Sequence, residues 1–419
     1  MAVHHRAGRP DGDRGTGMSH LLTSITAADP AADAGAPGHI PAADVPGAGT
    51  RGAAGRRQPR WPLRTRLVFA TVAGWSLFLA VFLWLTGTQW WWRPFELMPP
   101  LSFVAVPLLL VPLVLLARPV RARLALVLVG CLALGTDLAG LNMYALPGGR
   151  GGADVPVTAD AVRVFAWNTE YWHDGDDPER FYAYLADQRA DVYLLSEHVG
   201  WDLAGHRPVR VDHRAELRER FPDYEIVAVG ELLTMSRYPV VREHALDATP
   251  YLTDRRLGGP PPGSDFADYY RHKILRTDLL VGGSVLSAYN VHIPVQLDVS
   301  MDPRQREFTA FMRAQEIRRQ AHHRAVAADL AGNPAPVLLA GDFNATSAMG
   351  ELRALGCRLR DALPASREIH PVSWPDGSTP LWRLDWAFTA GPVRVHDYRM
   401  APSRGMSDHR GQLVTLSVS

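Results

Sequence analysis

The sequence predicts an α/β sandwich of the α+β kind, preceded by about three transmembrane helices. Two observations support this. Short apolar strand candidates recur from about residue 160 to the C-terminus, and many of them are adjacent in sequence, with helical patterns between only some of them. That arrangement favours packed sheets over a doubly wound parallel sheet. Three long apolar runs also crowd into residues 67–141, which is typical of a membrane domain.

The N-terminal segment, residues 1–62, is rich in Gly, Ala, Pro and Asp and has no apolar periodicity. Such a segment buries too little surface to offset its ordering entropy, so we expect it to be disordered. No apolar stretch follows its early charges, which argues against a signal peptide.

The membrane domain is expected at residues 63–145, with helices at about 67–86, 97–117 and 124–141. About 20 apolar residues span ~30 Å of hydrocarbon as a helix. Pro107 and Pro112 interrupt the second run, and Asp137 lies near the end of the third, where it is tolerated only at an interface or within a helix bundle. The alternative is that these are buried helices of a soluble domain, but three runs so close together favour the membrane.

Arginines predict the orientation of these helices. Six precede the first run between residues 51 and 66, and Arg118, Arg121 and Arg123 lie between the second and third, whereas the first loop has only Arg93. The positive-inside rule therefore places the N-terminus in the cytoplasm of a multi-pass cell-membrane protein. After three crossings, a linker at 146–158 and the domain at 159–419 lie outside. If the third run does not cross, that domain is cytoplasmic.

Within residues 159–419 the pattern predicts eight strands and two helices. The strands are expected at 162–167, 192–195, 224–229, 231–235, 279–281, 285–291, 337–340 and 386–389, and the helices at 179–189 and 303–330. The second helix is amphipathic and strongly basic. Its basic face would either contact anionic lipid or be solvated, and we favour the solvated interpretation. The sequence shows no internal repeat, glycine-rich nucleotide loop or zinc-ligand spacing.

Polar residues lie at the end or the start of five of these strands, and a sixth polar segment precedes the apolar run 413–416. The segments are Asn168-Thr169-Glu170, Ser196-Glu197-His198, Asn290-Val291-His292, Gly341-Asp342-Phe343-Asn344, Arg383-Leu384-Asp385 and Ser407-Asp408-His409. A single acidic residue at such a place is usually a turn former or a helix cap. Six together predict a site at one end of the sheets.

The residue types in these segments suit phosphoryl transfer assisted by a hard metal ion. Carboxylate and amide oxygens are what Mg²⁺ or Mn²⁺ prefers, and attack on a phosphoester also needs a base for water and donors for the phosphoryl oxygens. The chain has 44 basic and 43 acidic residues, for a net charge of +1. That balance argues against a protein devoted to coating duplex nucleic acid.

The order of these segments, together with Ser236-Arg237-Tyr238-Pro239, resembles the endonuclease/exonuclease/phosphatase (DNase I-like) superfamily. Gly341–Asn344 and Ser407–His409 are its most specific parts. The resemblance covers nearly everything after residue 160. It implies a four-layer sandwich of two packed mixed sheets flanked by helices, and a metal-dependent phosphodiesterase or phosphatase.

The resemblance also implies roles for individual residues. Those near the metal would be Asn168, Glu197 as the principal ligand, and Asp408. Glu170 stands where relatives often have Asn or Asp, which leaves its part as a ligand open. The catalytic residues would be His292 on the phosphate, Asp342 on the attacking water, Asn344 on the transition state, and Asp385 holding His409 against a phosphoryl oxygen.

The architecture of three helices followed by an external domain also resembles membrane-anchored superfamily members associated with teicoplanin-type glycopeptide resistance. That resemblance implies a lipid-linked phosphate or pyrophosphate of the cell envelope as substrate. Two alternatives remain. An anchored nuclease would need a basic, aromatic groove for nucleic acid. A sensor or scaffold would have an inactive site, yet the catalytic residues are intact. No protein partner is predicted.

Overall fold

The computed structural model describes residues 61–147, 157, 160–298, 300–355 and 359–418. The disorder expected for residues 1–62 and most of the expected linker therefore lie outside the described residues. Contacts among residues 62–419 join the apolar helices and the sandwich in one unit.

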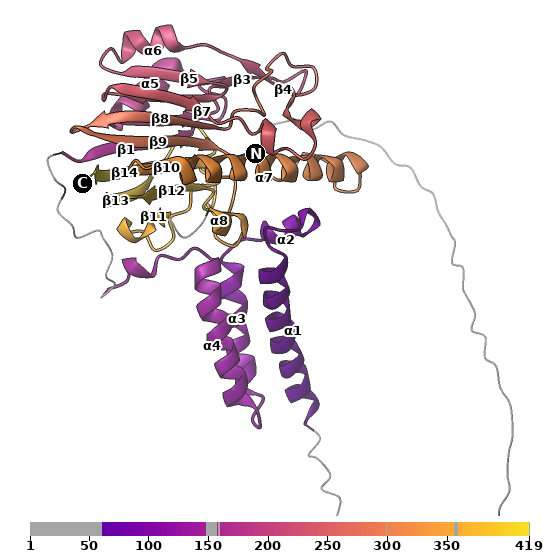
Figure 1. Ribbon diagram of the computed structural model, residues 1–419. Coiled ribbons are helices and arrows are strands. Elements are labelled where there is room, and N and C mark those ends of the chain that lie inside the picture. The colour runs from indigo at the N-terminus through magenta and orange to yellow at the C-terminus, as the bar shows by residue number, and fades with distance from the viewer. Residues whose placement is uncertain (1–60, 148–156, 158–159, 299, 356–358, 419) are drawn as a thin grey trace, which may run out of the picture. The chain divides into compact units, whose positions relative to one another are not determined.

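Two six-stranded sheets form the centre of this unit (Figure 1). The first has the order β13-β14-β1-β2-β6-β5, from Val393–Ala401, Gly411–Val418, Val162–Asn168, Val192–Ser196, Leu232–Ser236 and Glu225–Val229. The second has the order β11-β12-β10-β9-β8-β7, from Arg360–Asp361, Asp385–Ala390, Val337–Asp342, Ser284–His292, Ile274–Val281 and Val240–Ala245. A small hairpin pairs β3 (Val199–Asp202) with β4 (Arg207–Arg210).

Both large sheets are mixed. The pairs β1–β2 and β9–β10 are parallel, while the other pairs within these sheets are antiparallel. Apolar side chains from the two inner faces meet between the sheets, such as Val164 and Leu194 of the first and Ala288 and Leu338 of the second. Alternate side chains point outward, where they need a second cover.

Helices supply that cover and complete four layers. Helix α5 (Pro178–Asp187) and helix α6 (Arg214–Arg220) pack on the first sheet through residues such as Phe181 and Leu217. The long helix α7 (Arg306–Gly332) packs on the second sheet through Ala325 and Val326, beside the short α8 (Glu351–Ala354). The predicted sandwich of two mixed sheets is confirmed.

The basic face of α7 is solvated only in part: Arg306, Arg313 and Arg324 are exposed, but the interpretation was wrong for three other basic residues. Arg319, His322 and His323 are all buried. The reason is a partner on α8 and on neighbouring loops: Arg319 is bidentate to Glu351, and His322 Nε2 lies 3.0 Å from the carbonyl oxygen of Tyr270. A basic residue can be buried when a carboxylate or carbonyl satisfies it.

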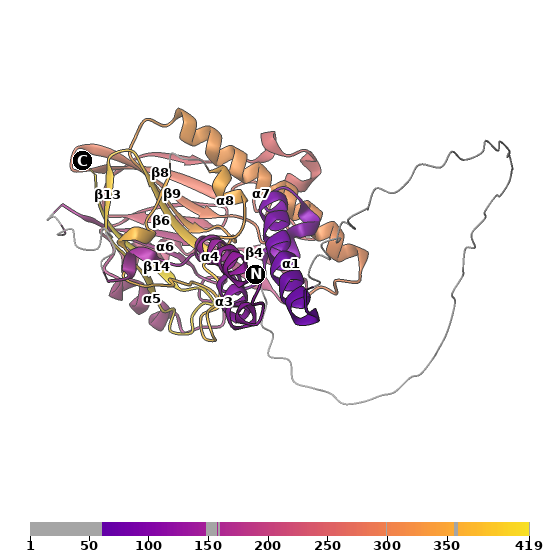
Figure 2. The ribbon, with the colours of Figure 1, turned by 90° about the horizontal axis from the view of Figure 1, so that it is seen from below.

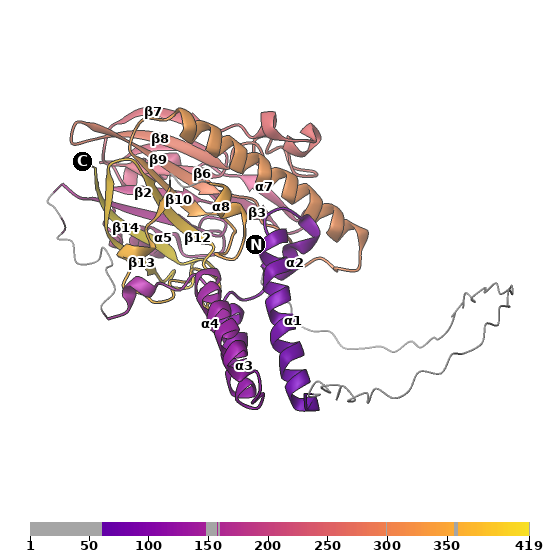
Figure 3. The ribbon, with the colours of Figure 1, turned by 60° about the horizontal axis from the view of Figure 1, so that its bottom comes forward.

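Three apolar helices precede the sandwich and lie side by side in Figures 2 and 3. They are α1 (Leu63–Leu85), α3 (Ser102–Leu115) and α4 (Arg121–Leu138), with a short α2 (Arg93–Glu96) between the first two. Among the described residues, α1 is the helix long and apolar enough to cross a membrane, and α3 is a shorter apolar helix. The expected second run begins later than predicted, because Pro99 and Pro100 belong to the turn before α3.

A buried ionic network joins α2 to the sandwich. The Arg93 guanidinium contacts Glu96 at 2.5 Å, Glu316 of α7 at 2.7 Å and Glu351 of α8 at 3.0 Å. All four side chains are buried, and Arg319 adds a second guanidinium to Glu351. Arg319 also donates to the carbonyl oxygen of Phe343 at 3.2 Å, so the network extends to the loop that follows β10.

Candidate active site

The strand ends of both sheets converge at one edge of the sandwich. In the first sheet, Asn168 ends β1 in register with Ser196, the last residue of the neighbouring parallel β2. In the second, Asp342 ends β10 in register with His292 of β9 and with Asp385, the first residue of the antiparallel β12. Topology thus brings together side chains that are far apart in the sequence.

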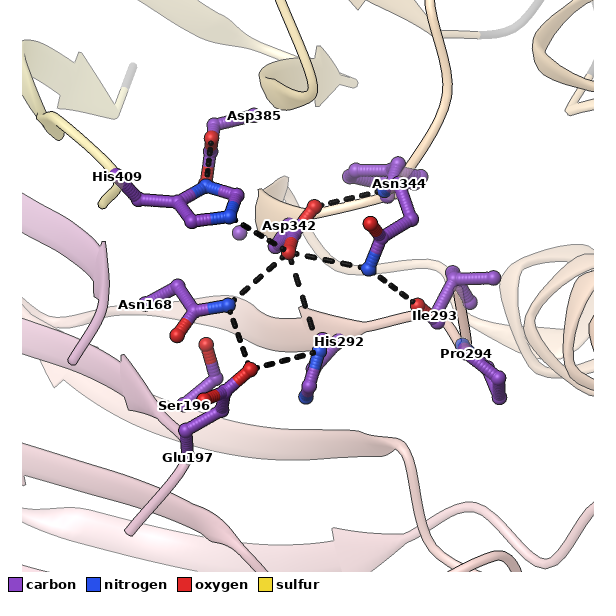
Figure 4. Close-up of polar contacts among 12 residues, drawn as sticks. Asn168, Ser196, Glu197, His292, Ile293, Pro294, Asp342, Asn344, Asp385 and His409 are labelled. Carbon is purple, nitrogen blue, oxygen red and sulfur yellow. Dashed lines mark hydrogen bonds and ion pairs between the residues drawn. The ribbon is translucent and has the colours of Figure 1, made fainter. Parts of the chain in front are cut away.

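Asp342 lies at the centre of this cluster (Figure 4). Its Oδ2 accepts hydrogen bonds from Asn168 Nδ2 and Asn344 Nδ2, both at 3.1 Å, and its Oδ1 accepts from the Asn344 backbone N–H at 2.7 Å. The Nε2 atoms of His409 and His292 lie 3.7 and 3.8 Å from the same Oδ2. Two amides and two imidazoles therefore surround one carboxylate oxygen.

His409 is held by Asp385, whose Oδ2 lies 2.8 Å from the ring Nδ1. Burial alone would lower the pKa of His409, but the carboxylates of Asp385, Asp342 and Asp408 together raise this pKa well above its usual value. These carboxylates therefore favour the protonated form of the ring. Its Nε2–H is available as a charged donor toward the centre of the site.

His292 is held in the same way by Glu231, a residue that sequence reasoning did not identify. Glu231 Oε1 lies 2.6 Å from His292 Nδ1 and also pairs with the buried Lys273. Although burial would raise the pKa of Glu231, His292 and Lys273 lower it to about 2, and Glu231 in turn raises the pKa of His292. The two histidines of the site thus each have an orienting carboxylate.

The residues expected to hold a metal form the other side of the cluster. Asn168 Nδ2 donates to Glu197 Oε1 at 3.0 Å, and Glu170 Oε2 accepts from the Asp408 backbone N–H at 2.6 Å. Burial raises the pKa of Glu197, and burial with the nearby Asp408 and Glu197 raises the pKa of Glu170 to about 8. Crowded carboxylates of this kind are stabilised in their ionised form by a bound cation.

Unpartnered oxygens test whether these residues suit a cation. Glu197 Oε2 and Asp408 Oδ1 are buried and have no hydrogen-bond partner among the described residues, and Asp385 Oδ1 shares this state. Buried polar atoms are normally satisfied, so unpaired carboxylate oxygens fit a divalent cation that prefers oxygen ligands. Asp342, Asp385 and His409 also lie close enough to form a candidate metal group. Because His409 Nδ1 and two amides already occupy the inner oxygens of that group, we favour the unpaired oxygens of Glu197 and Asp408 as ligands.

The structure brings all nine sequence-predicted residues into this one cluster. They are Asn168, Glu170, Glu197, His292, Asp342, Asn344, Asp385, Asp408 and His409. Besides Glu231 and Lys273, sequence reasoning also missed Trp374, whose Nε1 donates to Asp408 Oδ2 at 2.8 Å. Their signal was weak, because Glu231 precedes a strand like any turn residue and Lys273 lies in a basic stretch that resembles a solvated loop.

Part of the chain matches the model of a known protein family. The family model described as "Endonuclease/Exonuclease/phosphatase family" matches residues 165–409. Similar solved structures include an endonuclease/exonuclease/phosphatase from Bacteroides vulgatus, at 16% identity and TM-score 0.41, covering 62% of this chain and 99% of that one. A search among curated proteins found no match.

Two further similar structures carry functional descriptions. A mannosyl-6-phosphatase from Bacteroides thetaiotaomicron is 13% identical with a TM-score of 0.39, covering 61% of this chain and 99% of its own. A 3′ phosphatase from Neisseria, bound to a product DNA hairpin, is 16% identical with a TM-score of 0.41, covering 62% and 99%. Members of the matched family are hydrolases that act on phosphoester bonds and commonly use divalent metals. Since the family model spans more than half of the sequence, this chain belongs to the endonuclease/exonuclease/phosphatase family.

Proposed function

We propose that this protein is a membrane-anchored, divalent-metal-dependent phosphoester hydrolase that acts outside the membrane on a lipid-linked phosphate or pyrophosphate of the cell envelope. The observation that carries the proposal is the contact between the loop after Asn344 and the ends of the apolar helices. Ser347 Oγ donates to the carbonyl oxygen of Leu138 in α4 at 2.6 Å. Thr86, the C-cap of α1, donates to Ala348 O at 3.1 Å and accepts from Gly350 N–H at 2.9 Å.

An aromatic pair makes a second connection between the site and the helices. Trp374, which donates to Asp408, lies with its ring centroid 5.3 Å from that of Trp382. Trp382 Nε1 donates in turn to the carbonyl oxygen of Leu97, between α2 and α3, at 3.1 Å. A half-buried tryptophan pair suits an interface between lipid and water, because the indole is apolar with one polar group.

The helices present apolar surface where a bilayer would contact them. Leu67, Leu77 and Trp84 of α1 are exposed, as are Leu109 of α3 and Leu126 of α4. Exposed apolar patches of this extent mark a contact with lipid or another protein. We propose that α1, α3 and α4 all cross the membrane.

The ends of α1 and α4 that lie far from the sandwich carry Arg64, Arg66, Arg121 and Arg123. By the positive-inside rule those ends face the cytoplasm, which places the catalytic domain outside. In this proposal the membrane domain comprises residues 63–145 and the catalytic domain comprises residues 159–419.

The proposed reaction is hydrolysis of a phosphoester by an attacking water. Glu197 and Asp408, with further oxygens of Asn168 and Glu170, would hold Mg²⁺ or Mn²⁺, which would supply positive charge to the phosphate. Asp342 would orient the water and accept its proton, since its Oδ2 faces both imidazoles and both amides. His409 would donate to a phosphoryl oxygen as charge develops there.

The donors His292 and Asn344 complete the proposed cage around the phosphate. Asn344 Nδ2 donates one hydrogen to the Ile293 carbonyl oxygen at 2.9 Å and the other to Asp342 Oδ2 at 3.1 Å, so the amide is oriented before the substrate binds and would move its second hydrogen bond from Asp342 to a phosphoryl oxygen. The imidazole of His292 is fixed by Glu231. Pre-oriented donors stabilise a transition state without a further reorganisation cost.

The test is a substrate panel on the full chain reconstituted in nanodiscs with Mg²⁺. Polyprenyl pyrophosphate, polyprenyl phosphate, ordinary phospholipids and single-stranded DNA are compared for phosphate or product release, each with the wild type and with Asp342→Asn. We expect turnover of the polyprenyl substrates that is lost in the variant and on chelation of the metal. Preference for DNA would instead favour the anchored nuclease, and no metal-dependent turnover of any phosphoester would favour the inactive sensor or scaffold.

A topology experiment tests the orientation separately. Reporter fusions after residue 155 or at the C-terminus are expected to be active only for a reporter that works outside the cytoplasm. Activity of a cytoplasmic reporter would overturn the external placement while leaving the phosphoester chemistry intact.

A further inference from the structure

A second group of metal-ligating side chains lies outside the nine residues of the active site. His173 of that loop, His213 at the N-cap of α6 and Glu216 in the first turn of α6 offer one ligand atom each, and these atoms all lie within 4.8 Å of one another. The three side chains are half-buried. We propose that they form a transition-metal site that takes zinc.

The residue types favour zinc over the catalytic cation. Two imidazoles and one carboxylate are a zinc ligand set, whereas Mg²⁺ prefers oxygen ligands throughout. Zinc with three protein ligands keeps a fourth position for water or another ligand. His213 and Glu216 are three residues apart on one helical face, as ligands from a single helix often are.

The surroundings of the three residues are arranged as an outer shell. His213 Nδ1 lies 3.3 Å from Nε2 of the buried His198, a contact that orients the His213 ring. Tyr182 donates to Glu216 Oε2 at 2.8 Å and thereby fixes the carboxylate. Metal-binding side chains typically have second partners of this kind.

His173 shows the clearest lack of a partner. Its Nε2 is buried, yet within the described part of the chain it makes no hydrogen bond. A buried, unsatisfied imidazole nitrogen costs free energy unless something binds it. A metal ion would satisfy this nitrogen and would also join the loop after β1 to α6.

The loop after β1 has a strained backbone that such a cross-link would hold. Glu170, Tyr171 and Trp172 have φ angles of 50°, 65° and 59°, all in the left-handed region that non-glycine residues rarely adopt. Thr169 Oγ1 accepts from the Trp172 backbone N–H at 3.2 Å and supports the turn from within. The next residue is His173, so zinc there would fix the turn that presents Glu170 to the active site.

Zinc binding to the full chain tests the site, provided that binding at the active site is separated from it. The protein is purified without a polyhistidine tag, stripped with a chelator and titrated with Zn²⁺ in excess Mg²⁺, in the wild type and in Glu197→Gln. Wild type and Glu197→Gln should both retain one zinc of high affinity per chain. His213→Gln should lose it, with affinity reduced by more than about 100-fold, because loss of even an outer-shell partner typically costs about 10–100-fold.

Two further variants keep the test decisive. Glu216→Gln is nearly isosteric and retains an acceptor for Tyr182, so it folds if His213→Gln does not, and it should also weaken zinc. His244→Gln removes an exposed histidine of β7, a strand of the second sheet that is not part of the cluster, and should bind zinc as the wild type does. The absorption spectrum of bound Co²⁺ should show nitrogen and oxygen ligands in the wild type and vanish in Glu216→Gln. Equal zinc stoichiometry and affinity in the wild type and Glu216→Gln would overturn the proposal and leave an aromatic and histidine packing cluster.

Discussion

Replacing Arg93 with Met should weaken the attachment of the apolar helices to the sandwich and lower the free energy of unfolding. The substitution keeps an apolar stem but removes a guanidinium that contacts Glu96, Glu316 and Glu351 within 3.0 Å. Glu351 would keep its ion pair with Arg319, but Glu96 and Glu316 would each lose the guanidinium that contacts them. Breaking a buried ion pair by removing one partner costs about 3–5 kcal/mol.

The assay is thermal unfolding of the full chain in nanodiscs. At about 2–4 °C per kcal/mol, the Arg93→Met variant should unfold about 6–20 °C below the wild type. Burial already raises the pKa of Glu96. Without Arg93 this pKa should rise further, so the carboxyl becomes neutral on mild acidification and the deficit should narrow as the pH falls from neutral to about 5.

A matched control separates this network from ordinary surface charge. Arg313 is an exposed arginine of α7 whose guanidinium stacks at 4.4 Å over the ring of Trp90, at the same junction. Arg313→Met should cost less than about 1 kcal/mol. Equal unfolding temperatures for Arg93→Met and Arg313→Met, or a deficit that does not change with pH, would refute the reasoning.

Three other predictions concern the active site and the buried histidines. Asp342→Asn should lower kcat for phosphoester hydrolysis by about 10²–10⁴-fold without lowering the unfolding temperature, as steady-state kinetics and a thermal scan would show; a kcat near that of the wild type contradicts its role. Glu231→Gln leaves His292 without its orienting carboxylate, and kcat/KM should fall by about 10–100-fold, with an unchanged value counting against a positioning role. His322 and His323 have pKa values lowered by burial to about 3 and about 4, so they stay neutral in the fold while the unfolded chain protonates near 6.5. The free energy of unfolding should therefore decrease as the pH falls below about 6.5, by about 1.4 kcal/mol per pH unit for each histidine. His323→Leu should remove one such contribution, as chemical denaturation between about pH 5 and 7 would show. Parallel pH dependences of stability for the variant and the wild type would exclude this contribution of His323.

The central strands could be predicted from sequence because their apolar runs are buried on both faces. Strands β1, β2, β9 and β10 lie within about two residues of their expected limits at 162–167, 192–195, 285–291 and 337–340. Strands nearer the edges were missed. Strand β7 (Val240–Ala245) reads Val-Val-Arg-Glu-His-Ala and has a largely exposed pattern, and β13 (Val393–Ala401) also carries charged residues. Sheet partners, not local pattern, make these segments strands.

The candidate site was predictable to the extent that its residues follow buried strands. Asp342, His292 and Asn168 are strand ends, and their convergence follows from parallel pairing. The carboxylate that orients His292 could not be found in this way. Glu231 reaches it from the turn before β6, and that approach depends on how the two sheets pack.

The second metal group, like Glu231, could not be predicted from the sequence. His173 comes from a different element than His213 and Glu216, and the three-residue spacing of the latter pair does not by itself indicate a zinc site in a sequence. Their meeting depends on α6 packing against the loop after β1. No zinc-ligand spacing was recognised in the sequence, because spacing cannot reveal ligands that only the fold brings together.

The hydrogen bonds from Ser347 and Gly350 to the ends of α4 and α1 change how the reach of the enzyme should be understood. A domain on a flexible tether samples a volume set by the length of its linker. Here the loop that bears Asn344 is bonded directly to the helices, so the height of the catalytic centre above a bilayer would be set by helix length instead. Lengthening the linker at 146–158 should leave activity unchanged, whereas adding one turn to α1 and α4 would lift the centre by about 5 Å and away from phosphates in the headgroup layer. In the proposed orientation, the enzyme would therefore act on phosphates that lie at one fixed distance from the bilayer.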